Sequence, residues 1–286
     1  YTIKSPYLHP PSEPIVNKIH KYLINPYGYL IRPDYAITSS PFTILSTQKH
    51  FNIKTNKIIP LGRPKSDILY LNINKKINTF IDQNCNEFFN TQKKRILFLP
   101  TWRSNKNFSV FNLDFNLKDV DDFLNRSNAV LGFNFHPTSS NKEINIELSK
   151  CKNIFIFNSF GDEMNQLLSI TDLLITDYSS LFADYLVYNK PIVFAKFDHH
   201  AYLKEIDMAL DYDNDLPGIK VDNWTDMLKA LSDILINNND NYKNIRGDFI
   251  QKLYPNLDGK ARERIAKFIM SPLKTKENYN CEVPMQ

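Results

Sequence analysis

Glycine is scarce in this sequence, with 7 glycines among 286 residues. They form no cluster, so the chain has neither the phosphate-cradling P-loop nor the GxGxxG turn of dinucleotide-binding folds. The cysteines Cys85, Cys151 and Cys281 lack CxxC or Cys/His spacing, which predicts neither a zinc site nor a disulfide framework. No apolar run approaches the ~20 residues of a membrane-spanning helix. A formal net charge of +4 does not by itself indicate nucleic-acid binding.

Several short apolar runs have the character of buried strands, and helical patterns separate them. Continuous apolar strands that alternate with helices are typical of a parallel α/β sheet. At 286 residues and 42% hydrophobic content, the chain can support one large domain or two smaller ones. The five clearest runs are residues 96–99, 130–135, 154–157, 173–175 and 191–195.

Polar residues follow these runs, at the strand ends where ligands bind in parallel α/β sheets. Helix capping alone does not easily explain so many polar residues at one edge, so we interpret them as a site. They are Thr101, Arg103, His136, Thr176, Ser179, Ser180 and Asp198.

The segment TDYSS (residues 176–180) is the most informative of these strand ends. Small hydroxylated residues between a strand and a helix direct hydroxyls and free N–H groups toward one point. That point suits a phosphate, because a helix N-terminus adds orphan donors and partial positive charge. The alternative from this segment alone is an ordinary cap by Ser179 or Ser180.

Five motifs together resemble the CDP-glycerol glycerophosphotransferase family, the teichoic-acid and capsule-polymer polyol-phosphate transferases. They are GRPKSD (62–67), PTWR (100–103), FHP (135–137), TDYSS followed by Asp184 and KPI (176–192), and LDGKA (257–261). Their order and approximate spacing match the family from about Ala36 to Arg264. Lys65 takes the family's arginine position, which keeps the positive charge but loses the bidentate fork.

The resemblance implies an α/β fold of the GT-B type, with two Rossmann-like halves facing each other across a cleft. We therefore assign residues 1–90 to the remainder of an apparently incomplete acceptor-side half and its linker. Residues 91–272 are assigned to the half that binds the CDP-linked donor, and residues 273–286 to a polar tail.

The resemblance also implies the residues of the site. His136 is the predicted catalytic residue, because it could donate to the pyrophosphate or stabilise the departing CMP. The predicted donor-binding residues are Lys65, Pro100, Thr101, Arg103, Asn134, His136, Pro137, Glu163, Thr176, Asp177, Ser179, Ser180 and Asp184.

Most of these residues also have a purely structural interpretation. His136 could simply pack in a loop, and Arg103 could form a surface ion pair of little energetic consequence. Asp177 could order its own turn, while Glu163 and Asp184 could be acids of a helix's first turn, favoured by the dipole. A metal site made by Asp198 with the adjacent histidines 199–200 is disfavoured, since neighbouring residues rarely chelate one ion together, and we predict none.

One family element is not visible in the sequence. The family carries a His-Gly-x-Pro-x-Lys element whose histidine is thought to deprotonate the acceptor hydroxyl, and the chain opens on residues 1–4, YTIK, which could be its tail. None of His9, His20 and His50 has the right context. We therefore expect this chain to be part of a longer protein and to lack the catalytic base on its own.

The implied reaction transfers glycerol phosphate, or a similar polyol phosphate, from a CDP-linked donor to a hydroxyl of a cell-wall or capsule polymer, with CMP leaving. No cofactor is required, although Mg²⁺ often assists phosphoryl transfer by neutralising charge. The expected location is the cytoplasm, at the inner face of the cell membrane, with no nucleic-acid partner. Two alternatives stay open: a GT-B glycosyltransferase that uses a nucleotide sugar, and a non-catalytic protein that binds a polymer or a partner enzyme.

Overall fold

The structure is a computed structural model, and it describes residues 34–51, 53–74, 86–101, 103, 109–111, 114–135, 146–159, 161–205 and 210–272. These residues fall into two compact units. The sheet unit contains the described residues of 71–199 and 211–249, and the small unit contains those of 34–70, 200–210 and 250–272. Each unit includes one parallel sheet.

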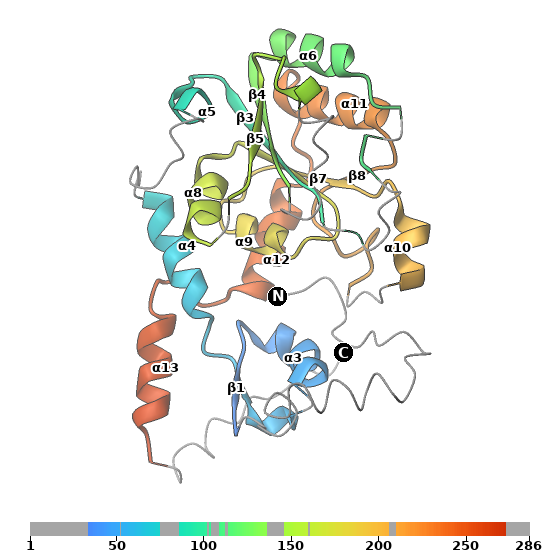
Figure 1. The fold of residues 1–286 in the computed structure, drawn as a ribbon. Helices are drawn as coiled ribbons and strands as arrows, with labels where there is room; N and C mark the ends of the chain where they lie inside the picture. The colour runs from blue at the N-terminus through green and yellow to red at the C-terminus, as the bar shows by residue number, and fades with distance from the viewer. Residues whose placement is uncertain are drawn as a thin grey trace. The chain divides into compact units, whose positions relative to one another are not determined.

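A parallel sheet of six strands forms the centre of the sheet unit (Figure 1). The five apolar runs of the sequence are confirmed as strands, and their burial explains why they read as continuous apolar segments. A sixth strand, β8, contains a lysine and had no such signal. The strands are β3 (Lys94–Leu99), β4 (Ala129–Asn134), β5 (Ile154–Phe157), β6 (Leu173–Thr176), β7 (Ile192–Ala195) and β8 (Ile219–Val221).

The strand order is β5-β4-β3-β6-β7-β8. The chain therefore runs from β3 outward to β5, returns to the middle of the sheet at β6, and continues in the other direction to β8. β3 and β6 are neighbours, with Leu99 beside Thr176 at their carboxyl ends. Ligands of doubly wound sheets bind outside the carboxyl ends of the strands at such a switch point. The fold thus places the loops after β3 and β6 at the expected binding position.

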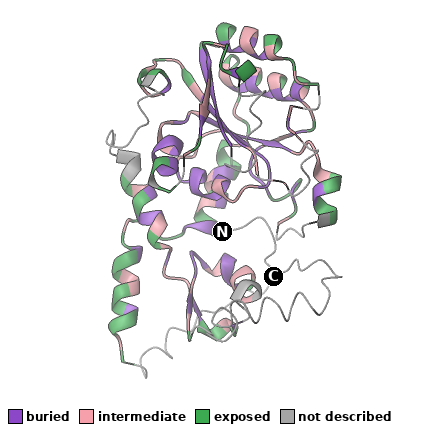
Figure 2. Ribbon diagram, viewed as in Figure 1, coloured by how far each residue is buried: buried purple, intermediate pink, exposed green. Residues whose placement is uncertain are grey.

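Two amphipathic helices, α6 (Leu117–Arg126) and α11 (Trp224–Leu235), cover one face of this sheet (Figure 2). Their buried residues recur three or four positions apart, as Val120 and Phe123 do on α6, and pack against strand residues in one apolar cluster. Burying a large apolar side chain in this way contributes about 1.5–3 kcal/mol. Packing of this stripe, rather than intrinsic helix propensity, accounts for most of the helices' stability.

The chain that follows β3 is fastened to the start of α11. The carboxylate of Asp114 accepts hydrogen bonds from the backbone N–H groups of Trp224 and Thr225, at 2.8 and 3.0 Å. The indole Nε1 of Trp224 donates to the carbonyl oxygen of Val110 at 2.7 Å. These bonds satisfy donors that a helix N-terminus leaves unpaired and fix the course of the chain beyond the β3 strand end.

The opposite face of the sheet is covered by further helices, and aromatic rings from two of them pack against the strands. The Phe182 ring packs edge-on against Phe194 with centroids 5.6 Å apart, and Phe88 packs against Phe157 at 5.0 Å. Gly132 lies under these rings, and a Cβ atom there would approach the Phe157 ring to 2.5 Å. The helices on this face are α5 (Asn86–Asn90), α8 (Asp162–Ile170), α9 (Leu181–Leu186) and α12 (Lys243–Leu253).

The small unit has a two-stranded parallel sheet. Its first helical segment begins at Pro41, directly after the N-cap residue Ser40, with a 3₁₀ turn. The remaining elements are β1 (Ala36–Ile37), η1 (Pro41–Thr43), α3 (Ile44–Phe51), η2 (Thr55–Lys57), β2 (Ile58–Ile59), α4 (Pro64–Asn74), α10 (His199–Glu205) and α13 (Ala261–Met270).

The helix α13 is joined to the small unit through Asp67. The buried carboxylate of Asp67 accepts hydrogen bonds from the backbone N–H groups of Ala261 and Arg262, at 2.8 and 2.9 Å, and so caps α13. Arg264 donates to the carbonyl oxygen of Leu61 at 2.8 Å. Because of these bonds residues 250–272 group with the first part of the chain, whereas the sequence-based ranges 1–90 and 91–272 assign them to the second half.

Candidate functional site

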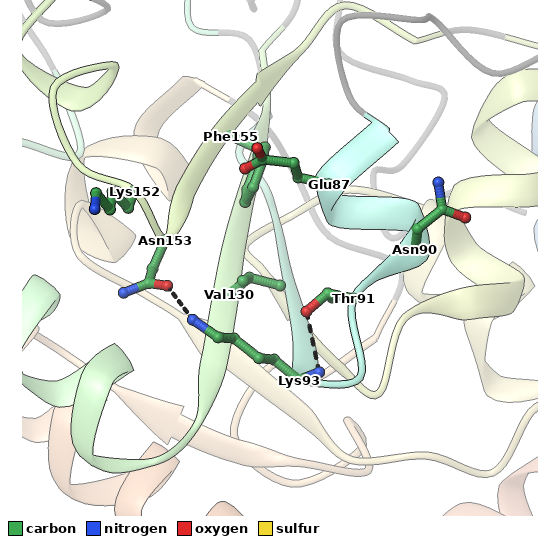
Figure 3. Close-up of a pocket in the computed structure, with 8 residues that line it drawn as sticks. All are labelled: Glu87, Asn90, Thr91, Lys93, Val130, Lys152, Asn153 and Phe155. Atoms are coloured by element: carbon green, nitrogen blue, oxygen red, sulfur yellow. Dashed lines mark hydrogen bonds between the residues drawn. The ribbon is translucent and has the colours of Figure 1, made fainter.

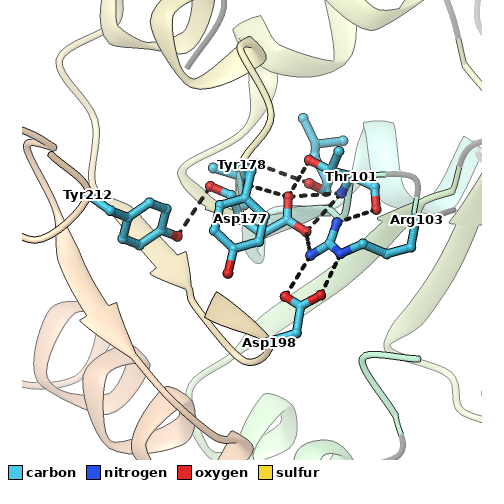
Figure 4. A network of polar contacts seen from close by, with 8 residues as sticks. Thr101, Arg103, Asp177, Tyr178, Asp198 and Tyr212 are labelled. Atoms are coloured by element: carbon cyan, nitrogen blue, oxygen red, sulfur yellow. Dashed lines mark hydrogen bonds and ion pairs between the residues drawn. The ribbon is translucent and has the colours of Figure 1, made fainter. Parts of the chain in front are cut away.

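Asp177 is the centre of a buried polar network at the switch point of the sheet (Figure 4). Its carboxylate accepts the backbone N–H of Thr101 at 2.9 Å and the Thr101 hydroxyl at 2.5 Å. It also accepts the backbone N–H of Tyr178 at 2.6 Å and Nη2 of Arg103 at 2.8 Å. One carboxylate therefore binds the loop after β3 to the loop after β6, and the structural interpretation of Asp177 holds.

Arg103 extends this network to the end of β7. Its Nε and Nη2 atoms bind the two carboxylate oxygens of Asp198 at 2.6 and 2.9 Å, and Nη1 donates to the Thr101 carbonyl oxygen at 2.7 Å. The side chains of Arg103 and Asp198 are 10% and 8% exposed. The interpretation of Arg103 as a surface ion pair is therefore wrong, because the pair is buried and bidentate.

Within the described residues, one guanidinium of this network faces the two carboxylates of Asp177 and Asp198. Burial alone would lower the pKa of Arg103, but the two carboxylates outweigh it and hold the pKa above its ordinary value. Burial, followed by the same carboxylates, raises the pKa of Tyr178. The guanidinium of Arg103 is thus bound by both carboxylates in this arrangement, and its contact with a donor phosphate stays a prediction.

An aromatic group packs beside the ion network. The Tyr178 ring stacks on His199 with centroids 6.0 Å apart and an interplanar angle of 20°, and Tyr212 lies 4.9 Å from the same His199 ring. The Arg103 guanidinium lies 4.9 Å from the Tyr178 ring centroid, a cation–π geometry. The Tyr212 hydroxyl donates to the Asp177 carbonyl oxygen at 3.2 Å, which further fixes the TDYSS turn.

The threonine and serine hydroxyls of the TDYSS turn have three different roles. The Thr176 hydroxyl is fully buried and donates to the carbonyl oxygen of Leu99 at 3.0 Å, so it does not point toward a ligand. Ser179 Oγ accepts the N–H of Leu181 at 3.3 Å, as a cap does. Ser180, the N-cap residue of α9, makes no side-chain capping bond and is the serine whose hydroxyl is left for another partner.

Three predicted site residues lie at or near other strand ends. Asn134 ends β4, and its side-chain amide exchanges hydrogen bonds with the backbone of Ser159, which joins the ends of β4 and β5. Glu163 is an exposed residue of the first turn of α8. Asp184 lies in the first turn of α9 and is 7% exposed. The alternative of a first-turn acid is therefore confirmed in position, but the acid does not face solvent, and its contact with the donor stays a prediction.

The remaining predicted site residues are only partly placed. Pro100 lies at the end of β3 beside the network, whereas His136 and Pro137 lie outside the described residues. Lys65 is a half-buried residue near the start of α4, in the small unit. Its approach to the donor from across a cleft stays a prediction.

The aromatic part of the site was missed by sequence analysis. Tyr212 belongs to the segment 210–218, which has no hydrophobic periodicity that could have placed it beside Tyr178. Asp198 had been noted at a strand end, but its partner Arg103 lies 95 residues away. Within the described residues no group of three or more His, Cys, Asp or Glu side chains is arranged to hold a metal ion.

Solved structures with similar folds place this architecture in a class. The wall teichoic acid polymerase TagF aligns with a TM-score of 0.69 and 23% identity over 97% of this chain and 66% of that chain. A UDP-N-acetylglucosamine 2-epimerase from Listeria monocytogenes aligns with a TM-score of 0.54 and 14% identity, over 88% of this chain and 62% of that chain. These likenesses show the fold, and the chain is an α/β protein of the GT-B type.

The family follows from the sequence match. The model of the CDP-glycerol:poly(glycerophosphate) glycerophosphotransferase family matches residues 29–271, and the chain belongs to this family. The teichoic acid ribitol-phosphate polymerase TarL of Staphylococcus aureus is 32% identical over 81% of this chain. The teichoic acid glycerol-phosphate transferase of the same organism is 27% identical over 83% of it. The chain spans 40% and 60% of the lengths of these two relatives.

Proposed function

We propose that this chain is the donor-binding part of a transferase that moves glycerol phosphate or a related polyol phosphate from a CDP-linked donor to a polymer hydroxyl. Family membership supports this reaction, as do relatives named as ribitol-phosphate and glycerol-phosphate polymerases, transferases and primases. The observation that carries the proposal is that the family motifs PTWR and TDYSS meet at the switch point of the sheet.

The proposed step is a displacement at phosphorus. An acceptor hydroxyl oxygen forms a bond to the phosphorus of the polyol phosphate, the bond to the bridging oxygen of the pyrophosphate breaks, and CMP leaves with that electron pair. The acceptor proton passes to a base, for which the family's His-Gly element is the candidate. His136 is proposed to donate to the departing phosphate, and positioning and charge neutralisation then supply most of the catalysis.

Different residues are proposed to position the loops of the donor site and to contact the donor. The ion network of Arg103, Asp177 and Asp198 holds the two loops in place, and the free side-chain hydroxyl of Ser180 is proposed to bind a phosphate oxygen. Because the described network has two carboxylates for one guanidinium, other groups are proposed to neutralise the charge of the donor, and Lys65 and His136 are the candidates. Mg²⁺ is a further candidate for the same task.

We also propose that the parent protein works at the inner face of the cell membrane, where wall and capsule polymers of this type are built. No helix among the described residues is long and apolar enough to cross a membrane. At the end of α13, Ile269 is 65% exposed and Met270 is 84% exposed, and Lys267 lies in the same helical turn. Apolar residues beside a cation suit an interfacial contact with anionic lipid.

Replacing Ile269 and Met270 by glutamate is expected to lower the co-sedimentation of the chain with vesicles of anionic phospholipid at least severalfold. The carboxylates cannot enter the interface and are repelled by the lipid charge. The exposed pair Ile236 and Ile245 of the sheet unit, changed in the same way, is the control. Equal sedimentation of all three proteins would reject α13 as the contact.

Donor binding is tested by calorimetric titration of the chain with CDP-glycerol, CMP, UDP and GDP, with and without EDTA. Selective binding of cytidine nucleotides is expected, and Ser180→Ala is expected to weaken CDP-glycerol binding about tenfold, the value of one hydrogen bond to a charged group. Ser149→Ala, an exposed serine of the same unit, is the control. A preference for UDP or GDP would reject the CDP donor in favour of a nucleotide-sugar glycosyltransferase, and an EDTA-sensitive affinity would establish the Mg²⁺ requirement.

A further inference from the structure

A pocket of about 320 Å³ lies at the amino ends of β3, β4 and β5 (Figure 3). This is the edge of the sheet opposite the carboxyl ends, where the ion network lies. The pocket is therefore separate from the proposed donor site, although both belong to the sheet unit. Its lining residues are Glu87, Asn90, Thr91, Lys93, Val130, Lys152, Asn153 and Phe155.

The pocket has an apolar floor and a polar rim. Val130 is buried and Phe155 half-buried, and both belong to strands of the sheet. Glu87, Asn90 and Lys152 on the rim are exposed. A concave apolar floor with a few convergent polar groups is the usual form of a small-molecule site.

The ammonium group of Lys93, which lines the pocket, is held in position by neutral amide groups. Lys93 Nζ donates to Asn153 Oδ1 at 2.6 Å, and the buried Asn153 in turn donates to Asn125 Oδ1 at 2.8 Å. An ammonium group has three donors, so two remain after this bond. Because its acceptor is an amide, the bond orients Lys93 without neutralising its charge.

The charges of the residues that line the pocket indicate which kind of ligand it can bind. Lys93 and Lys152 favour an anion such as a phosphate group. The Glu87 carboxylate on the same rim would repel a bare anion, but it accepts hydrogen bonds from hydroxyl groups, as the amide oxygens of Asn90 and Asn153 also can. A ligand that carries both a phosphate and several hydroxyl groups satisfies all of these residues, and its C–H groups can lie on Phe155.

We infer that this pocket is a second binding site, for a polyol-phosphate unit of the polymer chain. The inference rests on the proposed function for the identity of the ligand as acceptor or product polymer. A polymer held at this distal point as well as at the reaction site gains effective concentration for successive additions. The concave shape, with Val130 and Phe155 as its floor, favours such a discrete unit over the flat surface of a membrane.

The test is calorimetric titration of the full chain with a short poly(glycerol phosphate) or poly(ribitol phosphate) oligomer. The double substitution Lys93→Ala and Lys152→Ala is expected to weaken oligomer binding at least about tenfold, because two charge-assisted hydrogen bonds are lost. Its affinity for CDP-glycerol should stay unchanged. Lys118→Ala with Lys229→Ala, two exposed lysines on α6 and α11, is the matched control and should bind both ligands normally.

A second variant separates a polyol-phosphate site from a simple anion patch. Glu87→Ala is expected to weaken binding of the oligomer severalfold and to strengthen binding of inorganic polyphosphate, which has no hydroxyl groups for the carboxylate. Equal effects on both polyanions would overturn the inference.

The titrations also distinguish failure of the distal polyol-phosphate site from failure of the proposed CDP-donor function. Normal CDP-glycerol binding without oligomer binding, or oligomer binding that only the control variant weakens, would overturn the distal site and leave the proposed function intact. Oligomer binding that depends on Lys93 and Lys152, in a chain that binds no cytidine nucleotide, would support the site and reject the CDP donor.

Discussion

Asp177→Ala is expected to lower the free energy of unfolding by about 3–5 kcal/mol. The substitution removes the acceptor of four hydrogen-bond donors in a buried position, and each unsatisfied donor costs about 1–3 kcal/mol. Asp198 still neutralises Arg103 in the variant, which keeps the loss below that of an unpaired buried charge. Urea denaturation followed by circular dichroism measures the change through the transition midpoint.

The exposed carboxylate of Asp122 on α6 provides the control. It pairs with Lys118 one helical turn away, and exposed pairs of this kind contribute little to stability, so Asp122→Ala should unfold at nearly the wild-type midpoint. If Asp177→Ala also unfolded there, the network would not hold the loops after β3 and β6 together. A catalytic or ligand-binding role would then be the better interpretation of Asp177.

The parallel sheet could be predicted from the sequence because its strands are buried on both faces. Runs such as 96–99 and 173–175 contain no polar residue, and such short apolar runs between helical patterns are typical of the buried strands of an α/β sheet. β8 lacked this signal because it has only three residues and the middle one is Lys220. The order of the strands was not predictable, since it depends on how the crossovers pack.

The position of the site was predictable, but the task of each residue in it was not. Thr176 and Ser180 are both small hydroxylated residues near the end of β6. The Thr176 hydroxyl donates to the carbonyl oxygen of Leu99, whereas the Ser180 hydroxyl makes no capping bond. The two residues are four positions apart and their side chains have different surroundings. The apolar periodicity of a strand or a helix does not extend through the turn between them, so it does not predict this difference. Sequence analysis therefore finds the turn, and only the backbone geometry assigns its hydroxyls.

The same limit explains the roles of Arg103 and Asp177. Both residue types bind phosphate or metal ions in many proteins, and both also form buried ion pairs. Which of these occurs depends on Asp198, which comes from a different strand end and is near Arg103 only in the folded chain. The network shows what these charged residues do in the fold: they hold the loops after β3 and β6 together. Contact of Ser180 with the donor stays a prediction.

Asp240→Asn is expected to cost about 3–5 kcal/mol of stability, more than the double substitution Asp240→Asn with Arg246→Met. The Arg246 side chain is 1% exposed and its guanidinium forms a bidentate pair with Asp240. It also donates to the carbonyl oxygen of Asn189 at 3.3 Å, just after α9. Removing only the carboxylate leaves a buried positive charge without its partner, whereas the methionine of the double variant removes that charge and keeps much of the apolar volume.

A double-mutant cycle measured by urea denaturation gives the coupling between the two residues. Lys229 and Asp226 on α11, an exposed pair three residues apart, form the control cycle and should show little coupling. The double variant being less stable than Asp240→Asn alone would contradict the prediction. Arg246 would then stabilise the turn after α9 chiefly through the Asn189 carbonyl and its own packing, and the carboxylate of Asp240, 25% exposed, would count as a surface charge.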